Sequence, residues 1–144
     1  MTTESISVAQ STVERDDARR MMLFAGRSSR ELGEDIAGRL GIELGEMQVK
    51  SFANGEIYAR FVESVRGADV FLVQSTCNTY EEGGQSVNDS LVELLIMVNA
   101  AKLASARRII AVMPWYGYSR QDKKSAPREP ITAKMIADVL QTVG

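Results

Sequence analysis

Short apolar runs alternate with segments of helical periodicity along this chain, and that alternation limits the folds open to it. Three apolar runs predict buried strands, at Met21–Phe24, Asp69–Gln74 and Arg108–Met113. Three segments with helical spacing follow them, one from about Ser28 to Leu40, then Asn88–Ala104 and Thr132–Val143. Because strands and helices take turns, we expect an α/β domain with a mainly parallel sheet flanked by helices.

Local signals indicate where these elements begin and end. Ser28 and Glu31 have the spacing of a helix capping box, and Gly41 is placed to end the same helix. Asn54-Gly55 predicts an inserted β-hairpin, because both residues tolerate a positive φ. The β-like runs on either side are Val49–Phe52 and Ile57–Phe61. We expect the helices to bury apolar stripes made of Leu32, Ile36 and Leu40, of Leu91, Leu94, Leu95 and Val98, and of Met135, Ile136, Val139 and Leu140.

Length and charge favour a single domain of ordinary character. The chain has 144 residues, enough for one domain with a core and too few for two. Residues 1–20 are polar and hold no apolar stretch of signal-peptide type, so we expect a disordered lead-in before one domain at 21–144. The net charge of −2 lacks the basic excess of nucleic-acid binders. No apolar stretch approaches the roughly 20 residues that span a bilayer. We therefore expect a cytoplasmic protein that binds neither nucleic acid nor membrane.

Two residue types narrow the chemistry. The chain has no histidine and one cysteine, Cys77. This composition excludes Ser-His-Asp and Cys-His triads, a disulfide within the chain and a cysteine-rich zinc site. We expect any metal here to be a hard cation held by oxygen, such as Mg²⁺ on a phosphate. Cys77 has no histidine to act as its base and is expected to be a small, half-buried residue.

Ligands of parallel sheets bind at the carboxyl ends of the strands, and three segments occupy those ends here. They are Gly26–Ser29, Ser75–Asn88 and Tyr116–Lys124. In the third segment, Arg120 can hold phosphate oxygens in a bidentate way and Gln121 offers a neutral donor and acceptor. Asp122 can fix an arginine or hold a magnesium-bound water, and Lys123 and Lys124 add positive charge. A solvated charged loop is the alternative, and spacing alone leaves it open.

Two other segments have plain structural explanations beside a functional one. Phe52 can stack on a purine, and Asn54 and Glu56 can hydrogen-bond the edge of an adenine. An ordinary hairpin turn, with Phe52 in the core and Glu56 in water, explains the same residues. Gly26–Ser29 lacks the patterns of phosphate-binding glycine loops, so we interpret it as a helix cap.

Taken together, these segments resemble ribose-phosphate pyrophosphokinases. Phe52–Glu56 is similar to the adenine-reading hairpin of that family, which runs Phe-x-(Asn/Asp)-(Gly/Gln)-Glu. Further segments resemble the family in the same order, namely Glu63–Gly67, Gln74–Cys77 with Val87–Asp89, Arg120–Lys124, and Arg128 with Pro130–Lys134. The similarity covers about residues 21–144. One departure is Asn78–Ser86, a longer glycine-containing loop where relatives pass through two prolines.

The resemblance implies an activity and a set of site residues. The family transfers the diphosphoryl group of magnesium ATP to the 1-hydroxyl of ribose 5-phosphate, giving AMP and phosphoribosyl pyrophosphate for nucleotide biosynthesis. By this resemblance Phe52 stacks on adenine while Asn54 and Glu56 read its edge, usually in the site of a neighbouring subunit. Gly55, between them, counts among the nucleotide-binding residues. Arg120 and Gln121 hold the ATP of their own subunit. The family also implies a homo-oligomer, commonly a hexamer.

The resemblance covers only one half of the family's chain. The metal-binding histidine, the ribose-phosphate loop and the flexible loop with the catalytic lysine and arginine belong to the other half. We therefore expect no catalytic or metal-binding residue in this sequence, and no activity of this half alone. Two alternatives stay open: a non-catalytic regulatory or associated subunit of the same family, and a nucleotide-binding module that only senses ATP.

Overall fold

The computed structural model describes residues 20–79 and 84–144. The expected lead-in at residues 1–20 lies outside these ranges except for Arg20, as does the middle of the expected loop, residues 80–83. The strands are β1 (Met21–Ala25), β2 (Met47–Ser51), β3 (Ile57–Phe61), β4 (Asp69–Val73) and β5 (Arg108–Val112). The helices are α1 (Arg30–Leu40), α2 (Val87–Leu103) and α3 (Thr132–Val143), with 3-10 helices η1 (Arg27–Ser29) and η2 (Ser119–Gln121). Within the described ranges, no helix is both long and apolar enough to cross a bilayer.

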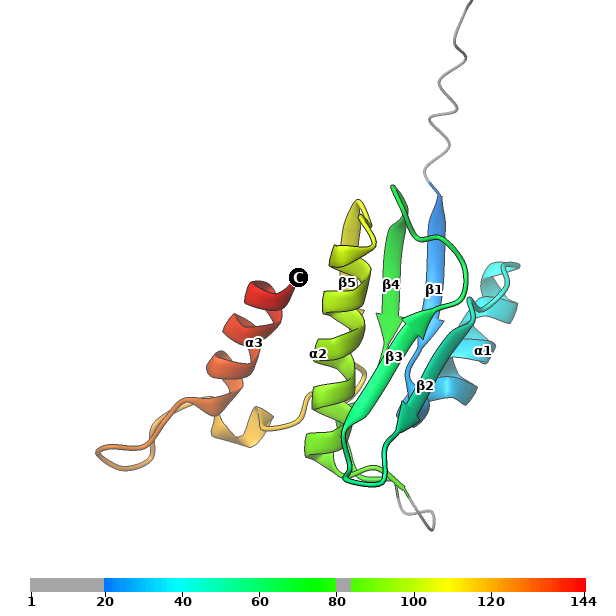
Figure 1. Cartoon of the computed structure of the whole chain (residues 1–144). Coiled ribbons are helices and arrows are strands. Elements are labelled where there is room, and N and C mark those ends of the chain that lie inside the picture. Colours follow the sequence, from blue (N-terminus) through cyan, green and yellow to red (C-terminus); the bar gives the residue numbers. More distant parts are fainter. Residues whose placement is uncertain (1–19, 80–83) are drawn as a thin grey trace, which may run out of the picture.

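Three strands form a parallel sheet, and the hairpin stands apart from it. The sheet has the order β1-β4-β5, with β4 in the middle and both pairings parallel. β2 and β3 pair antiparallel as a separate two-stranded sheet. Figure 1 shows α2 and the hairpin side by side over the parallel sheet, with α3 on the far side of α2. The expected α/β architecture with an inserted hairpin is confirmed.

Alternate side chains of the sheet enter two hydrophobic cores, one on each face. Phe24 and Leu72 are fully buried beneath α2 and the hairpin. The Phe24 ring meets Phe61 of β3 edge to face, with 4.7 Å between the ring centroids. On the opposite face, Leu23 and Val73 pack against α1. The near-continuous apolar runs of β1 and β4 follow from this arrangement, because both faces of these strands are covered.

The first helix begins later than predicted. The Ser28 hydroxyl lies 2.8 Å from Gln74 Oε1 and 2.7 Å from the Ser75 carbonyl oxygen, so it links β1 to β4. The capping box predicted at Ser28 and Glu31 is therefore wrong, and α1 starts after Ser29 without a side-chain cap. Gly41 ends α1 as predicted, with a φ of 67°.

Small residues form the buried face of α1. Gly33 and Ala37 are buried, whereas Leu32 and Leu40, which were predicted to face inward, are exposed. A Cβ at Gly33 would lie 2.5 Å from the Cβ of Ala25, so the helix packs directly on β1. Periodicity found the right helix but misplaced its inner face, because close packing selects small side chains here rather than large ones.

The hairpin has a longer turn than a two-residue connection. Its first strand is Met47–Ser51, two residues earlier than the predicted run, so Phe52 lies in the turn. The Phe52 N–H donates to the Glu56 carbonyl oxygen at 2.8 Å, and Gly55 has a φ of 88°. The hairpin predicted from Asn54-Gly55 is confirmed.

α2 is the central helix of the domain. Leu91, Leu94 and Val98 are buried as predicted, and Leu95 is half-buried. The same helix also buries Glu93, whose side chain has no exposed surface. A fully buried carboxyl group needs polar partners, and those partners lie at the edge that carries the candidate site.

β5 and α3 are less buried than predicted. β5 is half-buried along most of its length, and it is one of the two edge strands of the parallel sheet in the described structure. In α3, Ile136 is buried and Leu140 is half-buried. Met135 and Val139, which were predicted to face inward, are exposed. The predicted bounds of α3 are nevertheless confirmed.

Two glycines, Gly38 inside α1 and Gly41 directly after it, test the role of backbone conformation. We expect Gly41→Ala to lower the free energy of unfolding by about 1 kcal/mol, because Gly41 has a left-handed φ that alanine disfavours. No atom lies within 4 Å of the new Cβ, so the loss comes from backbone conformation and not from a clash. Gly38→Ala is the matched control inside the helix, equally open around its Cβ, and should raise stability by about 0.5–1 kcal/mol. Urea unfolding measures both, and changes of the same sign would contradict this explanation.

Candidate functional site

The carboxyl ends of the three parallel strands lie at one edge of the sheet, and the three predicted segments meet there. The Ser75 N–H donates to Ser29 Oγ at 2.7 Å, which joins the ends of β1 and β4. The Thr76 N–H donates to the Trp115 carbonyl oxygen at 2.9 Å, which joins the ends of β4 and β5. The edge is therefore a continuous, hydrogen-bonded platform.

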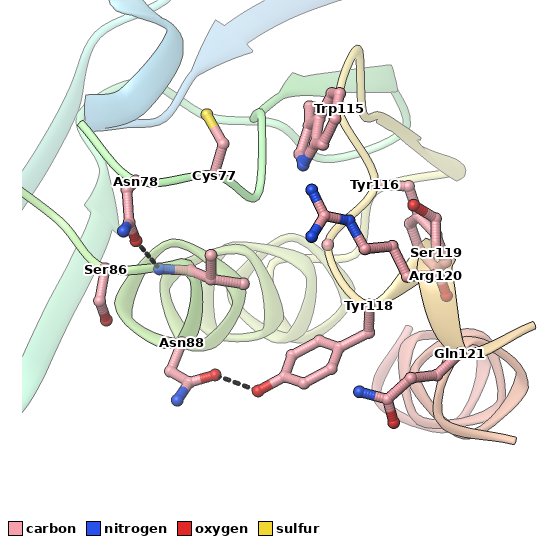
Figure 2. Close-up of a pocket in the computed structure, with 12 residues that line it drawn as sticks. Cys77, Asn78, Ser86, Asn88, Trp115, Tyr116, Tyr118, Ser119, Arg120 and Gln121 are labelled. Atoms are coloured by element: carbon pink, nitrogen blue, oxygen red, sulfur yellow. Dashed lines mark hydrogen bonds between the residues drawn. The ribbon is translucent and has the colours of Figure 1, made fainter. Parts of the chain in front are cut away.

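A pocket of about 820 Å³ opens between the segments that follow β4 and β5. One wall consists of Cys77, Asn78 and the first turn of α2, and the other wall runs from Trp115 to Gln121 (Figure 2). The pocket thus contains Arg120 and Gln121, two of the residues predicted to contact a ligand. Cys77 is half-buried, as predicted.

Thr76 fixes the backbone beneath this pocket. Its hydroxyl accepts the Gly117 N–H at 2.6 Å and donates to the Trp115 carbonyl oxygen at 3.0 Å. Gly117 is buried, and a Cβ there would lie 2.8 Å from the Thr76 carbonyl oxygen, so no larger residue fits without a shift. The sequence analysis placed Thr76 in the family-like segment Gln74–Cys77 but gave its hydroxyl no role, because a single threonine after a strand carries no pattern of its own.

Two tyrosines anchor the loop that carries Arg120. Tyr118 has a left-handed φ of 65°, and its hydroxyl hydrogen-bonds Asn88 Oδ1 in α2. The Tyr116 hydroxyl donates to the Ala133 carbonyl oxygen in α3 at 2.6 Å, and burial raises the pKa of Tyr116. The loop is thereby attached to both neighbouring helices, while η2 remains exposed.

η2 presents free donors at the rim of the pocket. Within residues 20–79 and 84–144, the Arg120 guanidinium has no hydrogen-bond or ion-pair partner, and Figure 2 shows it directed into the space beside Trp115. Gln121 Oε1 accepts a hydrogen bond from the Thr132 hydroxyl, which leaves the amide NH₂ group as a donor. An unpaired guanidinium beside amide donors suits phosphate oxygens.

The charged residues after η2 do not form a metal site in the described structure. Asp122, Lys123 and Lys124 are all exposed. No group of three or more acidic or cysteine side chains gathers anywhere in the described ranges.

The predicted adenine-binding residues lie on an exposed surface of the hairpin. Phe52 is 47% exposed, so the alternative that placed it in the core is wrong. Lys50 Nζ lies 5.2 Å from the centroid of the Phe52 ring. Asn54 Oδ1 accepts the Glu56 N–H at 3.1 Å. Gly55 and Glu56 line a groove of about 390 Å³ against the first turns of α2.

The hairpin surface and the Arg120 pocket remain separate within one chain. In the described structure, none of the residues of Phe52–Glu56 lines the pocket, and Arg120 and Gln121 do not line the hairpin groove. Asn88, on the first turn of α2, lines both. The structure therefore groups the predicted residues into two sets on either side of the start of α2.

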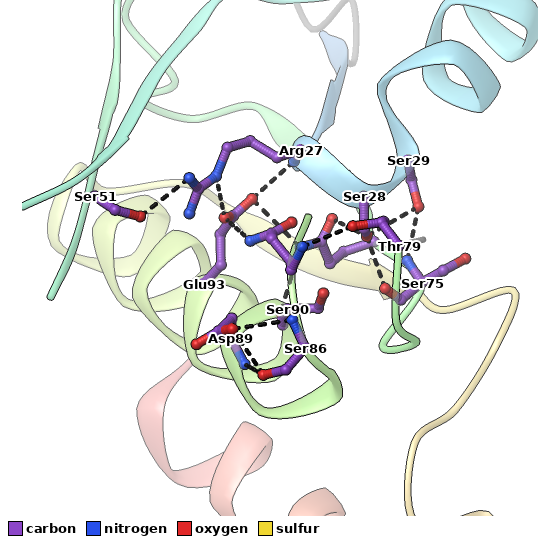
Figure 3. Close-up of polar contacts among 12 residues, drawn as sticks. Arg27, Ser28, Ser29, Ser51, Ser75, Thr79, Ser86, Asp89, Ser90 and Glu93 are labelled. Carbon is purple, nitrogen blue, oxygen red and sulfur yellow. Dashed lines mark hydrogen bonds and ion pairs between the residues drawn. The ribbon is translucent and has the colours of Figure 1, made fainter. Parts of the chain in front are cut away.

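A buried polar cluster supports this edge from below, and the sequence analysis missed it (Figure 3). Glu93 accepts hydrogen bonds from the N–H and Nε of Arg27, both at 2.7 Å. Gln74 Nε2 and Gln85 Nε2 also donate to its carboxyl group. The available signal was an acidic residue inside the apolar stripe of a helix, which needs a cationic or amide partner wherever it is buried.

A capping box does occur in this protein, but at α2. The Asp89 N–H donates to Ser86 Oγ at 3.1 Å, and the Ser86 N–H donates to Asp89 Oδ2 at 2.9 Å. Hydrogen bonds from the Ser86 hydroxyl and N–H lower the pKa of Asp89. The start of α2, which forms part of both candidate surfaces, is thereby fixed.

Replacing the Thr76 hydroxyl tests its structural role. We expect Thr76→Val to lower the free energy of unfolding by about 1–3 kcal/mol, because the buried Gly117 N–H loses its acceptor. Thr142→Val is the control, since that hydroxyl is exposed and bonds only to the preceding turn of α3. Chemical unfolding followed by circular dichroism measures both, and equal small losses would contradict the assignment.

The capping carboxylate predicts a pH dependence. Because the pKa of Asp89 is lowered in the folded state, its contribution to stability is present above the unfolded pKa of about 3.9 and is lost as the pH falls through the folded value. We expect Asp89→Asn to be less stable than the unsubstituted chain at neutral pH, with the difference shrinking below about pH 4. Unfolding curves across this range measure it, and a constant difference would contradict it.

Comparison with known proteins shows which family this domain resembles. Residues 21–144 match the family model described as the N-terminal domain of ribose phosphate pyrophosphokinase. A ribose-phosphate pyrophosphokinase of Nostoc sp. is 49% identical over 125 residues, which cover 87% of this chain and 36% of the relative. The Clostridium perfringens enzyme of the same name is 50% identical over 127 residues, covering 88% and 38% respectively. This chain therefore spans little more than a third of those relatives' length.

A solved structure agrees with the sequence comparisons. The crystal structure of phosphoribosylpyrophosphate synthetase from Mycobacterium smegmatis superposes with a TM-score of 0.78 at 46% sequence identity. The match covers 88% of this chain and 40% of that chain. The fold and the matched motifs agree in showing that this chain belongs to the ribose-phosphate pyrophosphokinase family and contains its N-terminal domain.

Proposed function

We propose that this domain supplies the ATP-binding part of a ribose-phosphate pyrophosphokinase. That enzyme transfers the diphosphoryl group of MgATP to the 1-hydroxyl of ribose 5-phosphate, and releases AMP and phosphoribosyl pyrophosphate for nucleotide biosynthesis. The observation that carries the proposal is the Arg120 guanidinium, which has no partner among the described residues and lies beside Gln121 at the carboxyl edge of a parallel sheet. Membership of the family supports it.

Arg120 and Gln121 hold the phosphates of ATP in this proposal. Phosphoryl transfer depends mainly on positioning and on stabilising negative charge, so an unpaired guanidinium is well suited to it. Thr76 and Tyr118 keep the backbone beside η2 in place, because both bind the loop to neighbouring elements. Such a pre-formed rim lowers the entropic cost of ordering the donors when ATP binds.

The hairpin contributes the adenine contacts. Phe52 offers an exposed ring, and Asn54, Gly55 and Glu56 follow it in the turn. Because these residues do not line the Arg120 pocket of their own chain, we infer that they serve the pocket of a second copy. The complete ATP site then requires a homo-oligomer, for which we expect the hexamer of the family.

The remaining ligands follow from the same proposal. Mg²⁺ enters as part of the substrate MgATP, held mainly by its phosphates. Ribose 5-phosphate and the catalytic groups belong to parts of the enzyme beyond the family's N-terminal domain, so no residue of this chain is assigned to catalysis. The substrates and the single cysteine favour a cytoplasmic enzyme.

The only tryptophan of the chain gives a direct test of ATP binding. Trp115 lines the Arg120 pocket and is 53% exposed, so MgATP should change its fluorescence. We expect Arg120→Gln to weaken MgATP binding by about tenfold or more, because a charge-assisted contact to phosphate is lost. The measurement is a fluorescence titration of the chain.

The matched control is Arg39→Gln, which removes the same charge from the exposed last turn of α1. It should leave the MgATP affinity unchanged. Equal affinities of all three proteins for MgATP, or no response of Trp115 at saturating MgATP, would contradict the placement of ATP in this pocket.

A further inference from the structure

The hairpin that carries Phe52 has few polar ties to the rest of the domain. Apolar packing holds its far end, where Phe61 meets Phe24. Near the turn, the Ser51 hydroxyl accepts a hydrogen bond from Arg27 Nη1 at 3.1 Å. In the part of the chain that the structure describes, this is the only side-chain hydrogen bond between residues 47–61 and other elements.

The arginine that makes this contact is itself fixed. Its backbone N–H and its Nε both donate to the carboxyl group of Glu93, each at 2.7 Å. The Glu93 side chain is fully buried, and Gln74 holds it from β4. Figure 3 shows the guanidinium lying between Glu93 and Ser51. Nη1 therefore has a defined position relative to the strand-end edge.

Ser51 lies next to Phe52 in the sequence, so its contact with Arg27 affects the base of the hairpin turn. Ser51 is the last residue of β2, and Phe52 follows it directly. Arg27 lies at the end of β1, on the same sheet edge as the Arg120 pocket. A single guanidinium thus ties the base of the hairpin turn to the edge that carries the phosphate-binding residues.

We propose that Arg27 is a positioning residue for nucleotide binding, acting through Ser51 to hold Phe52 in the orientation that stacks on adenine. This inference rests on the proposed function, because it assumes that Phe52 binds the base. A guanidinium is needed for both contacts, since Nε serves Glu93 while Nη1 reaches Ser51. Lysine has one nitrogen and can pair with Glu93 alone.

The test uses the full 144-residue chain and two ligands, MgATP and magnesium tripolyphosphate, which lacks the base. Arg27→Lys keeps a cation beside the buried carboxyl group, and Ser51→Ala removes the acceptor at an exposed position. We expect each change to weaken MgATP binding by about fivefold to tenfold, while tripolyphosphate affinity stays within about twofold. Arg30→Lys is the control, because in the described residues Arg30 forms an ion pair with the exposed Glu34 and no other.

A second comparison separates positioning from general damage. In a Phe52→Ala background, Arg27→Lys should cause no further loss of MgATP affinity, since the ring through which it acts is gone. The inference would be overturned if Arg27→Lys and Ser51→Ala weakened the binding of MgATP and of tripolyphosphate equally, or if they left MgATP affinity unchanged. It would also be overturned if the losses in MgATP affinity from Arg27→Lys and Phe52→Ala were additive. If Phe52→Ala alone leaves MgATP affinity unchanged, the adenine contact of the proposed function fails and the inference falls with it.

Discussion

The sheet edge that carries the candidate site depends on the hydrogen bonds of the buried Glu93 carboxyl group. Its partners come from the end of β1, the end of β4 and the loop before α2, so one side chain joins three segments. Removing a partner from a buried charge costs about 3–5 kcal/mol, whereas the intact pair adds little net stability. We therefore regard this cluster as fixing the geometry of the edge rather than as a source of stability. Arg27 extends that geometry to the hairpin.

The domain separates hydrogen-bonded support from the exposed residues of the candidate site. Thr76, Gly117 and Tyr118 hold the loop after β5 through hydrogen bonds. η2 lies at the rim of the pocket, and its Arg120 guanidinium has no partner in the described part of the chain. The hairpin likewise packs on the core through Phe61 at the end far from its turn, and it exposes Phe52 in the turn. The two surfaces lie on either side of the start of α2, and Asn88 lines both. The proposed ATP site assigns one part of the nucleotide to each surface.

The sequence predicted the architecture well, because the cores on both faces of the sheet impose long apolar runs on β1 and β4. It also predicted the hairpin, and it singled out Arg120 and Gln121, which line a pocket at the strand-end edge. The sequence failed where packing determines which side chains are buried. Leu32 is exposed although periodicity placed it inward, since a glycine of α1 packs directly on β1. Met135 is also exposed, since α3 is covered on only part of its surface. Ser28 was misassigned as a cap, because a cap and a cross-strand link use the same hydroxyl. Glu93 and Arg27 are far apart in sequence, so their pairing has no local pattern.

The most direct test of the central claim is whether this domain functions within the enzyme. A fusion protein would join residues 21–144 to the remaining portion of the Nostoc relative, which is 49% identical over the shared part. The measurement is AMP formation from MgATP in the presence and absence of ribose 5-phosphate. Our account predicts AMP formation that requires ribose 5-phosphate and is lost with Arg120→Gln. A folded, oligomeric fusion protein that binds MgATP but forms no AMP would contradict it.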